Sequence, residues 1–444
     1  MSRASVAAAL AAASFILGRT LLPEPALAQE APSEATVDSA YVYLLGRALA
    51  IRQEHMDRAA EGFAYNEISY NPLGSADFVN PNFDVAYLEA WIAVDTDTPA
   101  LLEVPEIEGR YYTAQILDEW GEVIANINER TFPSKPHGAF ALVAPGSTAP
   151  VPEGAGRIEL HGNKAKLLGR VEIKGDPEGA VALQHQFTLR STGEPAIADP
   201  APLPDFDNAA LMDAGIFDHT EAILADALDV SPVAAQMQQA ARAVAAYVAS
   251  SDTARAEVDA VLRDKVAPAF QQFAQTEVAP YRNHWLAVGV GGNYGADFRA
   301  RSAANYAGIW ANVPTEVVYF MASRDSDEAP LDGARSYVMH FPADRLPQSV
   351  VDGYWSVILV GVPDYRVVPN PLDRFNFNTY SGLEPEANGS LKIGVGPAPV
   401  AGVPEANWLP SAAGKPFSLT FRAYVPKSEV LAGRWQPPAL APVN

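Results

Sequence analysis

The residues best placed to do chemistry gather in one glycine-rich stretch, residues 285–310. A cluster of glycines is followed there by a segment with helical spacing, in which Asp297, Arg301 and Asn305 recur at four-residue steps. Residues four apart lie on one face of a helix, so these side chains would project together. The predicted ligand-binding set is Asn293, Tyr294, Asp297 and Arg301, with the Arg301 guanidinium holding an anionic group.

The same stretch also has a purely structural interpretation. A tight loop and a capped helix would use the same residues, with an Asp297–Arg301 ion pair that serves only packing. A dinucleotide site is not indicated, because the G-x-G-x-x-G spacing and the acidic residue that should follow it are absent. The ligand site and the structural loop stay open as alternatives.

A second polar pattern precedes Tyr87. Asn80, Asn82 and Asp84 alternate along the chain, and residues two apart point to one side of an extended strand. Together with Tyr87 they would form a hydrogen-bonding wall for a substrate. Asparagine and aspartate also favour turns, so a turn that leads into a strand is the alternative.

Carboxylates in these stretches suggest acid–base chemistry. Asp118 and Trp120 stand in a further turn, where they could bind a ligand or cap the turn. Asp84 paired with Asp118 or Asp297 could act as general acid and base if the carboxylates lie about 5–9 Å apart. The predicted catalytic residues are Asp84 and Asp297.

Metal and cofactor chemistry is not indicated. The chain has no zinc-protease, serine-hydrolase or P-loop motif, and its seven histidines are scattered without ligand spacing. Asp325, Asp327 and Asp332 stand in an acidic loop, but the glycine and terminal glutamate of an EF-hand loop are missing, so calcium there is left open. We expect neither a metal nor a cofactor.

Aromatic and amide side chains of the second half have two interpretations. Trp355, Trp408 and Trp435, with Asn370 and Asn407, could grip a sugar-like or aromatic small molecule. Alternatively, the aromatic rings close a β-sandwich core and the amides cap its turns.

Composition excludes some classes of function. A chain of 444 residues is too long for one ordinary core, so at least two domains are expected. The formal net charge of −22 disfavours nucleic acid as a partner. The absence of cysteine excludes disulfides, thiolate metal sites and a cysteine nucleophile.

The first residues have the pattern of an export signal. Arg3 precedes an apolar stretch from Val6 to Leu17, and Ala26-Leu27-Ala28 fits an A-x-A cleavage site. Because no other long apolar run follows, we expect a periplasmic or secreted protein with no membrane span in its mature chain.

Two helical regions are expected from apolar periodicity. A stripe over residues 41–49 predicts a first helix that runs to about Ala60, with Thr36 or Asp38 as its cap. Ser231-Pro232 predicts the start of a later helical block.

Short alternating segments elsewhere predict antiparallel strands. The expected fold is α+β, a β-rich two-domain protein with a C-terminal sandwich or jelly-roll-like domain and helices between the sheets. The expected division is a signal peptide at 1–28, an N-terminal β-rich domain with a leading helix at 29–205, a helical connecting segment at 206–284 and a C-terminal β-sandwich-like domain at 285–444.

Several motifs resemble those of bacterial exported proteins that pair two domains of unknown function, numbered 1254 and 1214. Asn80-Pro-Asn-Phe-Asp-Val-Ala-Tyr87 resembles the first, and Asn293-Tyr-Gly-Ala-Asp297, Asn388-Gly-Ser-Leu391 and Gly433-Arg-Trp435 resemble the second. The family's usual Asn-Asn-Asp-Thr-Leu-Tyr is here interrupted by Phe83, Val85 and Ala86. The resemblance implies a fold and an exported location but no reaction.

Two functions remain from these observations. The first is an enzyme, hydrolase-like or with other acid–base chemistry, acting on a small organic or saccharide-like molecule at the domain seam. The second is a non-catalytic periplasmic protein that binds a ligand or forms a homo-oligomer. A carboxylate with a raised pKa in a closed pocket would favour the enzyme.

Overall fold

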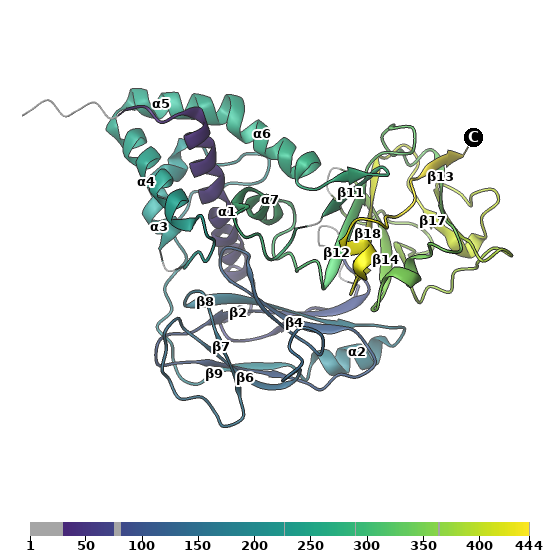
Figure 1. Cartoon of the computed structure of the whole chain (residues 1–444), viewed down its shortest axis with the longest axis horizontal. Coiled ribbons are helices and arrows are strands. Elements are labelled where there is room, and N and C mark those ends of the chain that lie inside the picture. Colours follow the sequence, from purple (N-terminus) through teal and green to yellow (C-terminus); the bar gives the residue numbers. More distant parts are fainter. Residues whose placement is uncertain (1–29, 75–80, 226, 289, 363–364, 444) are drawn as a thin grey trace, which may run out of the picture.

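The computed structural model describes residues 30–74, 81–225, 227–288, 290–362 and 365–443. The predicted signal, the candidate site residue Asn80 and Gly289 of the glycine cluster lie outside these residues. Two β-sandwiches and a helical body make up the molecule (Figure 1), with the helical body above the first sandwich and beside the second.

The first sandwich consists of a five-stranded sheet, order β1-β2-β8-β4-β5, packed on a four-stranded sheet, order β7-β6-β3-β9. The strands are β1 (Ser69–Tyr70), β2 (Val85–Ala93), β3 (Ala100–Val104), β4 (Tyr112–Leu117), β5 (Val123–Ile127), β6 (Gly138–Val143), β7 (Gly156–Glu159), β8 (Lys164–Glu172) and β9 (Thr188–Ser191), with helix α2 (Pro177–Gln184) between β8 and β9.

Side chains of the five-stranded sheet alternate between its two faces. Ala86 and Leu88 of β2 point into the sandwich core, whereas Tyr87 and Glu89 point to the opposite face. A polar face of this kind normally meets solvent. In this protein the helical body and the second sandwich cover it, so the polar face becomes the domain seam.

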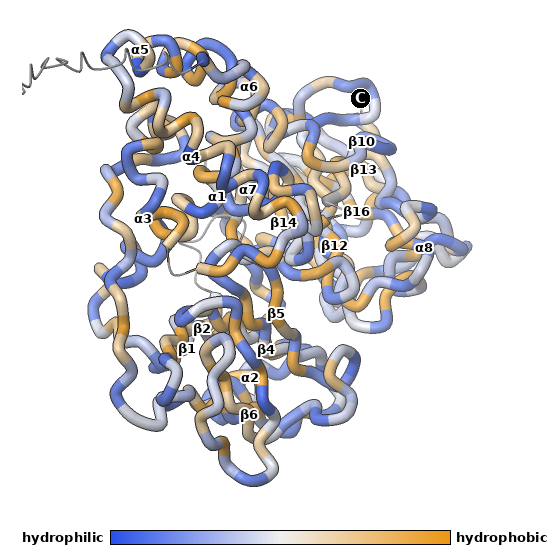
Figure 2. The backbone as a smooth tube through the Cα atoms, turned by 60° about the vertical axis from the view of Figure 1, so that its left-hand side comes forward, coloured by the Kyte–Doolittle hydropathy of each residue, from blue (hydrophilic) through white to orange (hydrophobic). Residues whose placement is uncertain are grey.

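Helix α1 is the centre of the helical body. The other helices are α3 (Thr220–Leu224), α4 (Ala234–Ser250), α5 (Asp252–Val261), α6 (Ala267–Gln272) and α7 (Phe298–Ala307). α1 spans Glu34–Arg58 and is buried continuously over residues 40–51, because α4 packs on one side of it and α7 on another. Figure 2 shows α1 and α7 next to each other above the first sandwich.

Both predicted helix starts are wrong by a few residues. Ser33, rather than Thr36 or Asp38, caps α1 by accepting a hydrogen bond from the Thr36 amide. α4 begins at Ala234 after Val233, and the Ser231 amide bonds to the Asp229 carboxylate. The cap of α1 is therefore earlier in the chain than expected, whereas α4 starts later than expected and has no side-chain cap.

The second sandwich confirms the predicted sandwich-like fold. A six-stranded sheet, order β10-β11-β12-β18-β14-β15, faces a four-stranded sheet, order β17-β16-β13-β19. The strands are β10 (Tyr281–Arg282), β11 (Trp285–Val288), β12 (Val317–Ala322), β13 (Ser336–Phe341), β14 (Trp355–Gly361), β15 (Asn376–Asn378), β16 (Leu391–Gly396), β17 (Trp408–Pro410), β18 (Phe417–Tyr424) and β19 (Ala441–Val443), with helix α8 (Ser428–Leu431) after β18.

Large aromatic residues fill the core of this sandwich. Trp355 stacks on Phe421 with ring centroids 5.6 Å apart, and Trp435 packs on the same ring. Both tryptophans belong to the buried core, as the packing alternative predicts for them. Within the described residues, no helix is both long and apolar enough to cross a membrane.

Candidate binding site at the domain seam

The two sandwiches meet through the polar faces of their larger sheets. On the first sheet, Tyr87 pairs with Arg170, and their side chains share one face. On the second sheet, Tyr319 pairs with Arg422 in the same way. Each sheet therefore presents a tyrosine–arginine pair to the other across the seam.

Asp84 joins the two sandwiches from the strand-entry turn of β2. Its Oδ1 accepts hydrogen bonds from the amides of Asn376, at 2.9 Å, and Asn378, at 2.8 Å, which both lie on β15. Its Oδ2 is buried and has no partner within hydrogen-bond geometry among the described residues, although the nearby Ser356 hydroxyl lowers the pKa of the carboxyl. Burial raises the pKa of Asp84, although the Asn378 amide and the Arg422 charge act against the rise.

Tyrosines pack around this aspartate. The Asn82 amide donates to the Tyr424 hydroxyl at 2.6 Å. Tyr424 stacks on Tyr354 with ring centroids 4.2 Å apart, and Tyr111 meets Tyr424 edge-on at 5.2 Å. The hydroxyls of Tyr111 and Tyr354 are buried without partners, so several polar atoms inside the seam remain unsatisfied.

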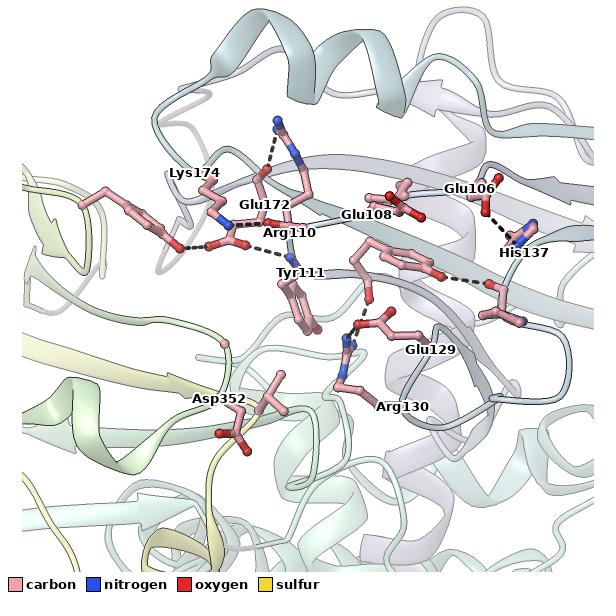
Figure 3. Close-up of a pocket in the computed structure, with 17 residues that line it drawn as sticks. Glu106, Glu108, Arg110, Tyr111, Glu129, Arg130, His137, Glu172, Lys174 and Asp352 are labelled. Atoms are coloured by element: carbon pink, nitrogen blue, oxygen red, sulfur yellow. Dashed lines mark hydrogen bonds and ion pairs between the residues drawn. The ribbon is translucent and has the colours of Figure 1, made fainter.

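A cleft opens at the edge of the same seam. We name it the seam cleft; its volume is about 590 Å³. The first sandwich contributes Glu106, Ile107, Glu108, Gly109, Arg110, Tyr111, Tyr112, Glu129, Arg130, Pro136, His137, Glu172 and Lys174, and the second contributes Asp352, Gly353, Tyr380 and Val425. In Figure 3, the side chain of Tyr111, the residue before β4, points toward the side of Asp352 and Arg130.

Glu172 organises the inner wall of the seam cleft. Its carboxylate accepts a hydrogen bond from the Tyr111 amide at 2.7 Å and from the Tyr380 hydroxyl at 2.8 Å. Tyr380 belongs to the second sandwich, so this contact bridges the two domains. Arg130 is held by Glu129 and by Glu316, at 2.9 Å, which leaves it little charge to offer a ligand.

Arg301 belongs to a second seam, between the helical body and the first sandwich. Its guanidinium donates to both oxygens of Asp229, at 2.8 and 2.9 Å, and approaches Glu122 at 3.4 Å. It also stacks over the Trp120 ring at 4.7 Å. The expected Asp297–Arg301 pair is therefore wrong: Asp297 is exposed and caps α7 by accepting from the Ala300 amide.

Asp118 stabilises its own turn through hydrogen bonds. Its Oδ1 accepts from the amides of Trp120 and Glu122, each at 2.9 Å, and its Oδ2 lies 2.7 Å from His161 Nδ1. The neighbouring Glu119 is buried against Arg47, at 2.7 Å. Burial raises the pKa of Glu119 to about 7, and the Arg47 charge only partly offsets this.

The predicted site residues that the structure describes thus fall into two groups. Asn82, Asp84 and Tyr87 lie in the seam between the sandwiches. Asp118, Trp120, Tyr294 and Arg301 lie in the seam under the helical body, with the Tyr294 amide donating to Glu122. Asn293 and Asp297 are exposed, and none of these residues lines the seam cleft.

Sequence reasoning missed Arg170 and Arg422, together with Tyr111 and Glu172. The available signal was the alternation of β8 and β18, which puts charged residues on one face of each strand. Alternation by itself indicates solvent on that face, so it could not show that the two faces meet.

This architecture defines a two-domain α+β protein whose sandwiches share a polar seam. Residues 62–191 match the family model described as "Protein of unknown function (DUF1254)", and residues 316–428 match "Protein of unknown function (DUF1214)". The chain therefore pairs an N-terminal domain of the first family with a C-terminal domain of the second, as the motifs predict.

Two solved structures resemble the chain. The VPA0106 protein from Vibrio parahaemolyticus superposes with a TM-score of 0.69 at 21% identity, over 93% of this chain and all of that one, which shows a shared fold. A protein from Burkholderia cenocepacia is more distant, with a TM-score of 0.42 at 13% identity over 92% and 94% of the two chains. No curated protein matches the chain.

Proposed function

We propose that this is an exported protein that binds a small organic molecule in the seam cleft. The observation that carries the proposal is that both sandwiches line one cleft of about 590 Å³. Ligand pockets commonly measure roughly 300–1,000 Å³ and favour domain interfaces. A ligand held there would also explain why the two domains occur together in one chain.

The lining indicates a ligand with both polar and apolar parts. Tyr380, which is 42% exposed, supplies aromatic surface, and Glu108 supplies an exposed carboxylate. Sugar-like and aromatic compounds combine the same two kinds of surface. The predicted signal at residues 1–28 supports an extracytoplasmic source for such a ligand, and N-terminal sequencing of the mature protein would test the cleavage site.

Ligand screening with matched variants tests this function. Thermal-shift screening of small metabolites should find a stabilising compound, whose affinity is then measured by calorimetry. Tyr380→Ala should weaken binding roughly tenfold, since an aromatic contact and its ordered geometry are lost. Tyr281→Ala is the matched control, because Tyr281 is 47% exposed, lies outside the seam cleft and likewise bonds a glutamate, Glu328.

The binding results also define the failure of the proposal. Glu108→Gln probes the cleft from the first sandwich, and Glu103→Gln is its exposed control on β3. A compound that binds equally well to wild type, Tyr380→Ala and Glu108→Gln would not occupy the seam cleft, and the proposal would be wrong.

Acid–base catalysis at Asp84 is the second candidate function. Its support is the buried, unpartnered Oδ2 of a carboxylate whose pKa burial raises. If a ligand that extends from the cleft into the seam beside Asp84 is turned over, Asp84→Asn should abolish turnover while binding persists. Asp297→Asn should leave turnover unchanged, because Asp297 is an exposed helix cap. Turnover that survives Asp84→Asn would exclude this role.

A further inference from the structure

Arg170 has no acidic partner in the part of the chain that the structure describes. We propose that Arg170 anchors an internal site for an oxyanion, a carboxylate, phosphate or sulfate group, between the two sandwiches. This inference deepens the proposed function, because it assigns an anionic end to the ligand of the adjoining seam cleft.

The hydrogen bonds of Arg170 leave its charge uncompensated. The residue is 4% exposed, and its Nη1 donates to Gln115 Oε1 at 2.6 Å. Its Nε is buried without a partner, and the guanidinium lies over the neutral Tyr87 ring at 5.3 Å. Buried charges in proteins are normally paired, because removing an ion from water costs several kcal/mol.

The nearest carboxylates on the same sheet face are engaged elsewhere. Glu172, two residues along β8, accepts from the Tyr111 amide and the Tyr380 hydroxyl. Glu89, on the adjacent strand β2, forms an ion pair with Lys166 at 2.8 Å. The sheet that carries Arg170 therefore offers it no free carboxylate.

The facing sheet brings a second guanidinium. Arg422 is 3% exposed, donates to the Pro81 carbonyl at 3.1 Å, and is attracted to Asp84. Tyr319 and Tyr424 interact with both arginines, so the two guanidinium groups lie near the same phenols. Arg422 thus brings a second guanidinium to the phenols that surround Arg170.

An oxyanion suits these donors better than a cation or a neutral group. Guanidinium groups bind carboxylates, phosphates and sulfates through paired charge-assisted hydrogen bonds. Tyr87 and Tyr319 are only half-buried although they lie between the sheets, so the seam is not closed at this row. The net charge of −22 opposes anions at long range, but salt screens it beyond about 8 Å.

The seam cleft lies next to this site. Glu172 lines the cleft and is two residues from Arg170 on the same face of β8. A ligand whose body occupies the cleft would therefore direct its acidic end past Tyr111 toward Arg170.

Titration with simple anions tests the site without the natural ligand. The mature chain is titrated with sodium acetate, phosphate and sulfate, against sodium chloride at equal ionic strength, and thermal unfolding is followed. At least one oxyanion should raise Tm above the value in chloride. The anion that raises Tm most shows whether the site prefers a carboxylate, a phosphate or a sulfate. Arg170→Gln should weaken that anion roughly tenfold to hundredfold.

The variants carry their own controls. Arg190→Gln should keep the full response, because Arg190 is exposed on β9, in the sheet that does not form the seam. Arg170→Gln in chloride should unfold at the wild-type temperature or above it, since a buried charge without an acidic partner has been removed.

Three results decide the inference. If no oxyanion raises Tm above chloride, or if Arg170→Gln responds like wild type, the site does not exist. If Arg170→Gln fails to fold, wild-type crystals soaked in the most effective oxyanion decide, with selenate used in place of sulfate and bromoacetate in place of acetate; density is expected beside Arg170, and its absence would overturn the proposal. If no anion raises Tm but an organic ligand binds and Tyr380→Ala weakens its binding, the proposed function holds and the oxyanion site does not exist.

Discussion

Arg301 and Asp229 form a buried two-hydrogen-bond ion pair that ties α7 to the loop before α4. The donor–acceptor distances are 2.8 and 2.9 Å, and the side chains are 1% and 0% exposed. Tyr43 donates a further hydrogen bond to the same carboxylate at 2.7 Å. The pair neutralises Arg301, the arginine that sequence spacing predicts as an anion site. Its contribution to the stability of the helical body can be measured.

Asp229→Asn should destabilise the protein by about 2–4 kcal/mol, since the charge of the buried Arg301 is then paired only with Glu122, at 3.4 Å. Denaturant unfolding monitored by tryptophan fluorescence would measure the change. Asp264→Asn is the control, because the Arg263–Asp264 pair is exposed to solvent and its loss should change stability little. If the two substitutions lowered the free energy of unfolding equally, the predicted contribution of the buried pair would be wrong.

The stability of the protein should depend on pH through Glu119. Burial raises the pKa of this carboxyl from 4.5 to about 7, so between these values the folded state binds more protons than the unfolded state. Its contribution is present below pH 4.5 and is lost as the pH rises through 7, a change of about 3 kcal/mol.

Glu119→Gln tests that pH dependence. The substitution keeps an oxygen acceptor for Arg47 but removes the titration. The free energy of unfolding of wild type minus that of the variant should decrease as the pH is raised from 5 to 8. A difference that is constant over this range would show that Glu119 titrates alike in the folded and unfolded states.

Asp84 should hold the two sandwiches together through the β15 amides. Asp84→Ala removes the acceptor of Asn376 and Asn378 and should cost about 2–4 kcal/mol, because each buried donor left unpaired costs about 1–3 kcal/mol. Asp84→Asn keeps an acceptor oxygen and should cost less. Asp205→Ala, at an exposed position, should change stability by less than about 0.5 kcal/mol. An Asp84→Ala variant as stable as this control would exclude the bridge.

Gly46 lets α1 and α7 approach each other closely. A Cβ at this position would collide with the Ser302 side chain of α7. Gly46→Ala should therefore lower stability by about 1–2 kcal/mol, even though alanine favours a helix by about 1 kcal/mol. Gly308→Ala is the control, since open space surrounds that position. A Gly46→Ala variant more stable than wild type would show that the helices pack less closely.

Local patterns were sufficient for the sheets and for one helix cap. Strands such as β8 and β18 largely alternate apolar and polar residues, and the apolar side chains of each strand do form a sandwich core. Asp297 does cap α7, because capping joins groups only three residues apart. The motifs that resemble the two families also lie where the family models match.

Partners distant in the chain could not be predicted in this way. Arg301 pairs with Asp229, 72 residues away, rather than with the nearby Asp297. Asp84 bonds Asn376 and Asn378 at separations of 292 and 294 residues. Hydrophobic periodicity shows which face of an element is apolar, but it does not show which polar face meets which.

By itself the sequence determined the two β-rich domains, the apolar side of each strand and the family motifs, because these depend on neighbours in the chain. Only the tertiary structure decided that the polar faces of β8 and β18 lie against each other instead of facing water. That burial turns Arg170 from a solvated surface charge into a buried charge with no acidic partner among the described residues, because desolvation depends on what covers a side chain.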